Sequence, residues 1–399
     1  GLSHEGASGR RHVFSVTSNH HENIYMTVRS GETQLTLQEL INFGKDADKN
    51  TVLQSAVWLK KDLPVRMGHR VQELQSLPLP MFQTKSVLDL CNLYEESFVR
   101  ITEHESPKTS AAEESFSKML LDIKDKHRMV QANIAEGFKE MVREGVPRRF
   151  MEANDIQEIL TKFYTGRIGV RLLIDQHLML RQDAEEREKA GEEYIRQSKN
   201  KQAAFVGVVQ TACPIKEVIL DAVEDARSAC KLHLRDAPNV RIDGMKDLMA
   251  SYIPEHLYMI LLELVKNSMR ATVELHGRQS SSHEPMFGEN LPPIRITITG
   301  GEDVIIRISD RGGGISPESF SRIWNFSFST APQGIGELAG FGHGLPLSRL
   351  YARYWGGNIQ VYNMENLGLD VFVRLGVPQD GYANMEPQWK KRDRASEAV

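Results

Sequence analysis

Hydrophobic residues between positions 35 and 180 recur at intervals of three and four, the spacing that places them on one face of an α-helix. Helices are predicted over residues 50–59, 63–77, 86–101, 113–143 and 154–180. Pro64 indicates a helix start and Pro78 a helix end. Because these long amphipathic segments follow one another without a strand pattern, this part of the chain is predicted to form an antiparallel four-helix bundle.

The pattern changes after a segment rich in charged residues, 181–203, which is expected to be a solvated linker or an exposed helix extension. Beyond it, helical patterns alternate with short apolar runs typical of strands. Helices are predicted over residues 214–231, 254–277 and 348–355, and strands over 240–242, 294–299, 304–309, 358–362 and 369–375. Helices packed on one face of a mixed sheet form an α/β sandwich, so the fold class of the whole chain is α+β.

Five regions follow from these patterns. They are a flexible N-terminal segment (1–34), a helical bundle domain (35–180), the charged linker (181–203), an α/β domain (204–378) and a C-terminal tail (379–399).

Composition narrows the function classes. The 399 residues carry a net charge of −4, which argues against an obligate nucleic-acid binder. The chain lacks the apolar run of about 20 residues that a transmembrane helix needs. Its three cysteines lie far apart, so neither a disulfide framework nor a CxxC metal site is supported.

The helix predicted at 254–277 carries a narrow polar ridge on an otherwise apolar surface. Glu263, Asn267, Arg270 and Glu274 fall within one stripe of this helix. Buried polar groups need partners, so the ridge is expected to line a cavity. The amide oxygen of Asn267 suits Mg²⁺, and Glu263, one turn away, could deprotonate a nucleophile. Taken alone, a Glu/Asn pair at this spacing is also a common surface feature.

Two glycine-rich segments add to the ridge. Asp310 follows a predicted strand and precedes Gly312, Gly313 and Gly314, an arrangement that could bind an exocyclic amine and admit close approach of a base, or simply form a tight turn. The second segment, GFGHGLP at 340–346, leads into a predicted helix and so offers backbone N–H groups to an anion.

The order and spacing of these three motifs resemble the nucleotide-binding domain shared by histidine kinases, gyrase, Hsp90 and MutL. The strings LPVRMGHR, FYTGRIGVRLLIDQH, ELVKNSMRATVE, ISDRGGG, STAP and AGFGHGLPLSRLYARYWGG further resemble the mitochondrial protein kinases that act on pyruvate or branched-chain 2-oxo acid dehydrogenases. Two of them, ELVKNSMRA and GLPLSRLYARY, favour the pyruvate dehydrogenase kinases.

The resemblance implies a role for each matched residue. Glu263 would be the general base for a serine hydroxyl, and Asn267 would bind the Mg²⁺ that accompanies ATP. The remaining nucleotide-binding residues implied are Lys266, Arg270, Asp310, Gly312, Gly314, Ser329, Thr330, Gly340, Phe341, Gly342, His343, Gly344 and Leu345.

A regulatory pocket for a small acid is also implied, with His127 and Arg167 at matching positions and Lys124 where the family often has an arginine. A satisfied core histidine is the competing interpretation of His127. The chain departs from the family at Met259, where some members have a histidine that tunes the base, and at Leu369, where the family has a threonine.

The resulting hypothesis is a Mg-ATP-dependent protein-serine kinase that inactivates the E1α subunit of pyruvate dehydrogenase. The implied partners are the lipoyl domain of E2 and a second copy of the chain, and the implied location is the mitochondrial matrix. Branched-chain 2-oxo acid dehydrogenase is the alternative substrate. A histidine kinase is disfavoured because the helical half lacks an H-E-x-[KR] box, and a non-catalytic ATP-binding scaffold is disfavoured because Glu263 and Asn267 are both present.

Overall fold

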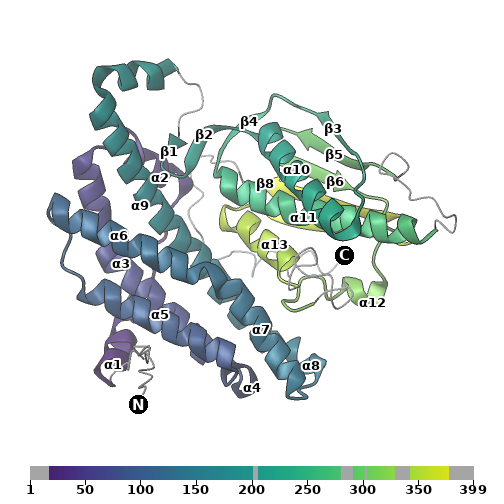
Figure 1. Ribbon diagram of the computed structural model, residues 1–399, viewed down its shortest axis with the longest axis horizontal. Helices are drawn as coiled ribbons and strands as arrows, with labels where there is room; N and C mark the ends of the chain where they lie inside the picture. Colours follow the sequence, from purple (N-terminus) through teal and green to yellow (C-terminus); the bar gives the residue numbers. More distant parts are fainter. Residues whose placement is uncertain (1–17, 201–204, 280–290, 302, 329–341, 377–399) are drawn as a thin grey trace, which may run out of the picture.

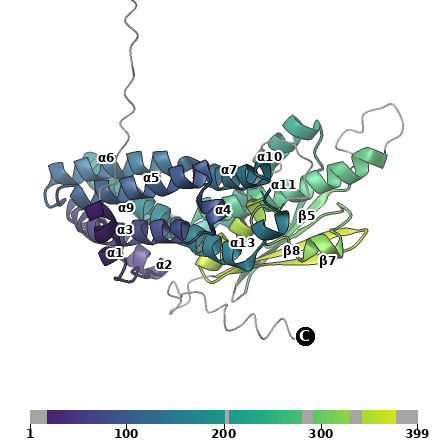
Figure 2. The same ribbon diagram turned by 90° about the horizontal axis from the view of Figure 1, so that it is seen from below.

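The computed structural model describes residues 18–200, 205–279, 291–301, 303–328 and 342–376. The chain forms a helical half and a mixed α/β half that lie side by side (Figures 1 and 2). The helical elements of the first half are α1 (Ser18–Thr27), α2 (Leu37–Gly44), α3 (Lys49–Gln75), α4 (Leu79–Phe82), α5 (Lys85–Glu103), α6 (Ser110–Lys126), the 3₁₀ turn η1 (His127–Met129), α7 (Val130–Arg143), α8 (Arg148–Met151) and α9 (Asn154–Asn200).

The second half contains two sheets and the helices that cover them. Its elements are β1 (Phe205–Val206), β2 (Val209–Pro214), α10 (Ile215–Leu234), β3 (Val240–Gly244), β4 (Met249–Tyr252), α11 (Pro254–Gln279), β5 (Ile294–Thr299), β6 (Val304–Ser309), α12 (Pro317–Phe320), α13 (Gly344–Tyr354), β7 (Asn358–Met364) and β8 (Gly368–Leu375).

A five-stranded mixed sheet in the order β3-β5-β6-β8-β7 forms the floor of the second half. Only the β3–β5 pair is parallel. Ile294, Ile296 and Ile298 of β5 are fully buried and alternate with more exposed residues, as expected for a sheet with one covered face. The helices α10, α11 and α13 cover that face (Figure 1). The predicted α+β class, with a helical bundle followed by an α/β sandwich, is confirmed.

Two elements differ from the sequence prediction, and a third follows one of its two alternatives. The predicted break at Pro64 is wrong, because Pro64 lies inside the single helix α3. Its missing N–H costs about 3 kcal/mol in a helix interior, but α3 buries residues along its whole length against neighbouring helices, and this burial outweighs the cost. The helix predicted over 113–143 is interrupted by η1. The charged segment 181–203 continues α9 as far as Asn200, the helix extension that the charge pattern allowed.

The sequence pattern also missed a small three-stranded sheet, β1-β2-β4. These strands are short, and β2 contains a register irregularity between Gln210 and Cys213, so they show no regular alternation. Among the described residues, no helix has an apolar stretch sufficient to cross a membrane.

The two halves share their hydrophobic cores. Phe326 and Leu347 belong to the second half by sequence, yet they are 2% and 7% exposed within the core of the helical bundle. In return, Leu37, Ile168 and Leu172 of the helical half pack in the core of the α/β half. Because each half completes the other's core, we expect the two to unfold together.

The expectation of a flexible segment over residues 1–34 does not hold for residues 18–34. Helix α1 packs on α3 with Ile24 buried, and Glu32 lies against the arginines of α3. The Glu32 carboxylate pairs with Arg66 at 3.2 Å and with Arg70 at 3.0 Å, and it lies 3.1 Å from Nδ1 of His69. Burial raises the pKa of Glu32, but the His69 contact and the two arginines outweigh it and lower the pKa to about 2.

We therefore predict that Glu32→Gln destabilises the protein at neutral pH by on the order of 2–3 kcal/mol. A carboxyl whose folded-state pKa is depressed stabilises the fold above its unfolded pKa, and that contribution disappears as pH falls from 4.5 toward about 2. Urea unfolding between pH 7 and pH 2 measures both effects. Glu114→Gln, which removes a carboxylate from an exposed pair with Lys118, is the matched control and should change stability much less. Equal losses in the two variants would contradict the prediction.

Candidate active site

The polar ridge of α11 has the arrangement that its sequence predicts. Glu263, Asn267 and Arg270 are partly exposed, whereas Leu257 and Leu261 on the opposite arc are fully buried. The apolar arc packs against α10, α13 and the sheet, so the helix is fixed and its ridge is held in one orientation. Among the described residues, the amide of Asn267 has no hydrogen-bond partner and is free to act as a ligand.

The Glu263 carboxylate is held between a lysine and a second helix. Lys266 Nζ donates to Glu263 Oε1 at 2.7 Å, with both side chains largely buried. On the other side, a Cβ added to Gly344 would lie 2.3 Å from Glu263 Oε2. Glycine at position 344 therefore lets the start of α13 approach the carboxylate directly, which places Glu263 beside a helix N-terminus.

The first turn of α13 is arranged to receive an anion. The N-cap residue is His343, whose side chain makes no capping hydrogen bond, and Pro346 in the same turn has no N–H. The N–H groups of Gly344 and Leu345 are therefore not used within the helix. Gly342 adopts a φ of +77°, which glycine tolerates best, and a Cβ there would lie 2.8 Å from Phe328 O. This arrangement fits binding of phosphate groups.

His343 lies in the glycine-rich turn, and its ring points away from that turn. The ring is 3% exposed and packs among Phe138, Tyr164 and Phe326, with ring centroids 6.2, 5.8 and 5.8 Å away. Burial lowers its pKa to about 4, so the ring is neutral. The predicted nucleotide contact of His343 therefore stays a prediction that concerns its backbone at the start of α13.

Asp310 is a buried carboxyl at the end of β6. It accepts hydrogen bonds from Gly312 N at 2.9 Å and Leu369 N at 3.2 Å. Burial raises the pKa of Asp310, although these N–H groups and the Ser268 hydroxyl partly offset the increase. A Cβ at Gly312 would lie 2.5 Å from Ala271 Cβ, so this turn requires glycine to lie against α11. Leu369 contributes its backbone N–H, a role that does not need the threonine found in the family.

Gly314 closes the same turn with a φ of +75°, and a Cβ there would lie 2.7 Å from Asn363 Oδ1. Arg270 lies farther along the ridge, and its Nε is 3.7 Å from Glu274 Oε1.

Four of the predicted nucleotide-binding residues lie outside the described residues, namely Ser329, Thr330, Gly340 and Phe341.

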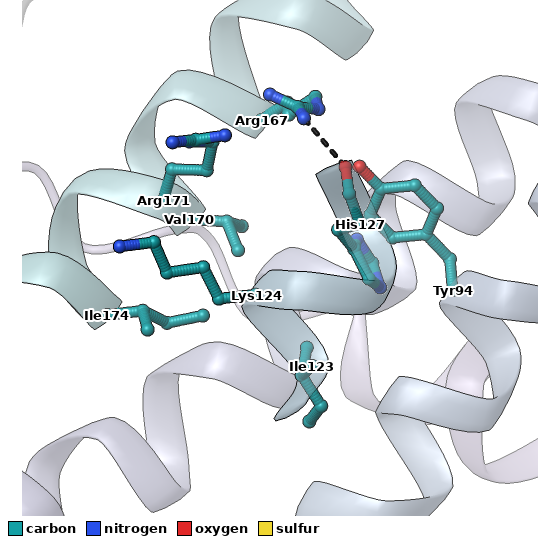
Figure 3. A pocket seen from close by; sticks show the side chains of 8 residues that line it. All are labelled: Tyr94, Ile123, Lys124, His127, Arg167, Val170, Arg171 and Ile174. Atoms are coloured by element: carbon teal, nitrogen blue, oxygen red, sulfur yellow. Dashed lines mark hydrogen bonds between the residues drawn. The ribbon is translucent and has the colours of Figure 1, made fainter. Parts of the chain in front are cut away.

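A second site is a pocket in the helical half (Figure 3). Its lining consists of Tyr94, Ile123, Lys124, His127, Arg167, Val170, Arg171 and Ile174. The three predicted residues thus lie together. Tyr94 and Arg171 were missed, although Arg171 follows Arg167 by one helical turn and a search for basic pairs at that spacing would have found it.

The pocket combines positive charge with an apolar wall. Arg167 is 4% exposed and donates to His127 O at 2.8 Å, while its buried Nε has no partner among the described residues. Arg171 lies 3.6 Å from Glu255, and Lys124 pairs with Asp175. An orphaned buried N–H among cations suits a small anion.

His127 satisfies both interpretations given by the sequence. It lines the pocket, and its Nε2 also lies 2.8 Å from Ser97 Oγ within the bundle core. Burial, with smaller contributions from Arg167 and Lys126, lowers its pKa to about 3. It is therefore a neutral wall of the pocket, and the interruption of the helix at η1 brings it there.

Both halves of the chain are similar to known proteins. Residues 34–210 match the family described as mitochondrial branched-chain alpha-ketoacid dehydrogenase kinase, and residues 252–379 match the histidine kinase-, DNA gyrase B- and HSP90-like ATPases. Mouse mitochondrial pyruvate dehydrogenase (acetyl-transferring) kinase isozyme 3 is 34% identical over 363 residues, covering 87% of this chain and 81% of its own. The Arabidopsis thaliana mitochondrial pyruvate dehydrogenase (acetyl-transferring) kinase is 34% identical over 360 residues, covering 86% and 90%.

The chain belongs to the mitochondrial 2-oxo acid dehydrogenase kinase family. It is therefore a protein kinase with an ATP-binding domain of the GHKL type, and the predicted family is confirmed. In this kinase the free N–H groups at the start of α13, the amide of Asn267 and the carboxyl of Asp310 are chemically suited to phosphate, a divalent cation and an amine respectively.

We predict that Gly344→Ala lowers kcat of the kinase by about 100-fold, because the added methyl group displaces the Glu263 carboxylate and a displacement of about 1 Å is sufficient for such a loss. Steady-state kinetics at saturating ATP measures it. Gly301→Ala is the matched control, since nothing lies within 4 Å of a Cβ there. An unchanged kcat in Gly344→Ala would show that this contact does not position the carboxylate.

Proposed function

We propose that this protein is a Mg-ATP-dependent protein-serine kinase that phosphorylates the E1α subunit of a pyruvate dehydrogenase. The observation that carries the proposal is the Glu263 carboxylate, fixed by Lys266 and by the N-terminus of α13 within a helix that also presents Asn267. The relatives, which are named pyruvate dehydrogenase (acetyl-transferring) kinases, support the choice of substrate.

Each residue has one task in this proposal. ATP supplies the phosphoryl group, and the N–H groups of Gly344 and Leu345 bind phosphate oxygens. Asn267 would supply an oxygen ligand to Mg²⁺, which would neutralise charge on the phosphates. Glu263 orients the serine hydroxyl and takes its proton as the serine oxygen bonds to the γ-phosphorus and the bond from that phosphorus to the leaving ADP oxygen breaks. Lys266 keeps Glu263 in place, which is how this chain compensates for Met259.

Arg270, Asp310, Gly312 and Gly314 complete the nucleotide side in this proposal. Asp310 would accept a hydrogen bond from the adenine amine, and the two glycines leave room for the base. The proposed location is the mitochondrial matrix, and the proposed partners are E1α, a lipoyl domain of E2 and a second copy of the chain. The domain boundaries given in the sequence analysis stay a prediction.

A branched-chain 2-oxo acid dehydrogenase kinase is the second candidate. The observation that favours it is the match of residues 34–210 to a family described by that name. The catalytic residues are the same in both cases, so the two candidates differ only in the protein substrate.

The pocket lined by Lys124, His127 and Arg167 is proposed to bind a small carboxylic acid that regulates the kinase. The unpartnered Nε of Arg167 is available to a carboxylate, and the guanidinium of Arg171, which also pairs with Glu255, adds positive charge beside it (Figure 3). Val170 and Ile174 suit a short apolar chain.

The first test is transfer of labelled γ-phosphate from Mg-ATP to pyruvate dehydrogenase E1α and branched-chain E1α in parallel. We expect acid-stable phosphoserine on one E1α. Glu263→Gln should lower kcat by 10²–10⁴-fold, on the scale of a general base, while ATP binding persists. Asn267→Ala should abolish Mg-dependent ATP binding. Glu224→Gln, an exposed carboxylate of the neighbouring helix α10, is the control.

Three outcomes would contradict this assignment. A normal rate in Glu263→Gln would exclude it as the base. Acid-labile phosphate on the protein itself would indicate a histidine kinase, and ATP binding without transfer to either E1α would indicate a scaffold.

For the pocket, we expect Arg171→Met to weaken binding of pyruvate or a short-chain carboxylate about tenfold, a loss of about 1.4 kcal/mol. Isothermal titration calorimetry measures the affinity directly. Arg128→Met removes an equal charge from an exposed arginine that pairs with Asp125, and it should leave the affinity unchanged. Equal affinities in wild type and Arg171→Met would exclude the pocket as the binding site.

A further inference from the structure

Two segments of the α/β half are attached to helix α9 of the helical half. The first surrounds Phe326, whose backbone N–H donates to Gln157 Oε1 at 2.7 Å. The Gln157 amide nitrogen donates in turn to Met151 O at 2.9 Å and to Phe326 O at 3.5 Å. One side-chain amide therefore binds both backbone groups of Phe326, as a neighbouring strand would. Arg322 also pairs with Glu152 just before α9 begins.

The second attachment is the ring of His343. It lies among Phe138 of α7, Tyr164 of α9 and Phe326. Tyr164 also stacks on Phe326, with centroids 5.1 Å apart. His343 and Phe326 thus share one aromatic cluster with the helical bundle. We call this cluster, together with Gln157, the interdomain clamp.

Burial of the His343 ring in this cluster lowers the stability of the fold. Both ring nitrogens are buried, and neither has a partner among the described residues. An unpaired buried polar group costs about 1–3 kcal/mol, so an aromatic residue without nitrogen would give a more stable core. The ring also does not cap α13, although the N-cap position favours side chains that do. Its contribution is to packing, which leaves the first N–H groups of α13 free.

The backbone between the clamp and the catalytic carboxylate is short. Gly344, which lies against Glu263, follows His343 directly. On the other side, Gly342 packs on Ser327 and Phe328, and Ser327 adopts a φ of +72°, an unfavourable conformation for serine. Such strained residues persist where the surroundings fix them. Movement of His343 or Phe326 would therefore move the turn that fixes Glu263.

We propose that Gln157 and His343 are positioning residues for phosphoryl transfer, acting from the helical half through Gly344 on Glu263. The inference rests on the proposed function, in which Glu263 is the general base. It goes further by making the bundle, and Gln157 of α9 in particular, a structural part of the catalytic site. Neither side chain contacts the substrate in this proposal, and their effect is on kcat.

The test compares full-length variants by kinetics. His343→Ala should lower kcat about 10- to 100-fold per folded molecule, with the KM for E1α changed less than twofold. His343→Phe keeps the ring and should restore kcat to within about threefold of wild type while raising the unfolding temperature. Gln157→Leu should lower kcat by about as much as His343→Ala does. Gln157→Glu retains the acceptor for Phe326 N–H, so its kcat should lie between those of Gln157→Leu and wild type.

Phe116→Ala is the matched control for a purely structural effect. Phe116 is fully buried in the bundle and contacts His104 and His177 instead of the clamp. It should lower the unfolding temperature and leave kcat per folded molecule unchanged. The proposal is overturned if His343→Ala keeps the wild-type kcat or if His343→Phe does not restore kcat. It is also overturned if Phe116→Ala lowers kcat per folded molecule as much as His343→Ala does.

A second measurement separates failure of this proposal from failure of the proposed function. Leu347 N–H donates to His343 O at 3.0 Å and reports on the first turn of α13. Hydrogen exchange of this amide should accelerate about tenfold in His343→Ala and Gln157→Leu but not in Phe116→Ala, whether or not E1α is phosphorylated. Unchanged exchange would overturn the clamp, whereas accelerated exchange in an enzyme without serine kinase activity would overturn only the function.

Discussion

The close approach of Gly344 to the Glu263 carboxylate is the constraint on which the rest of the site depends. Two helices meet there with no room for a methyl group between them. Helix α11 is fixed because its apolar arc is buried, and α13 is fixed because Leu347 is inserted into the bundle core. The position of one carboxylate thus depends on the packing of both halves. Phosphoryl transfer asks the protein mainly for positioning and charge stabilisation, and this packing supplies the positioning.

The helical half consequently supports the position of the Glu263 carboxylate. Besides the clamp, α9 contacts α13 through Gly169, where a Cβ would lie 2.7 Å from the Tyr354 hydroxyl and 3.1 Å from Arg66. Arg66 in turn pairs with Asp62 and Glu32. Contacts of α9 with Tyr354 and Arg66, together with the ion pairs of Arg66 in α3, therefore join the N-terminal segment, the bundle and the last helix of the α/β half. The pocket that contains His127 is lined in part by the same helix, through Arg167 and Arg171, one to two turns from Tyr164.

The pocket and the polar ridge of α11 are connected through one ion pair. Arg171 lines the pocket and lies 3.6 Å from Glu255 in the first turn of α11. The exposed pair contributes little to stability by itself. Its importance is geometric, because it joins the pocket to the same rigid helix that carries Glu263.

The sequence by itself determined the local elements and the candidate site residues. Periodicity gave the bundle helices, β5 and β6 to the residue, and the narrow polar ridge of α11, because burial on one face leaves a direct trace in the order of side chains. The motif spacing selected Glu263, Asn267 and Asp310 as candidates, and their roles stay a prediction. Tertiary structure alone decided that Pro64 lies within a helix, that His127 lines a pocket and lies beside Ser97 in the bundle core at the same time, and that the His343 ring packs into the bundle. These depend on contacts between residues far apart in the chain, and the energy of such contacts leaves no periodic pattern in the sequence.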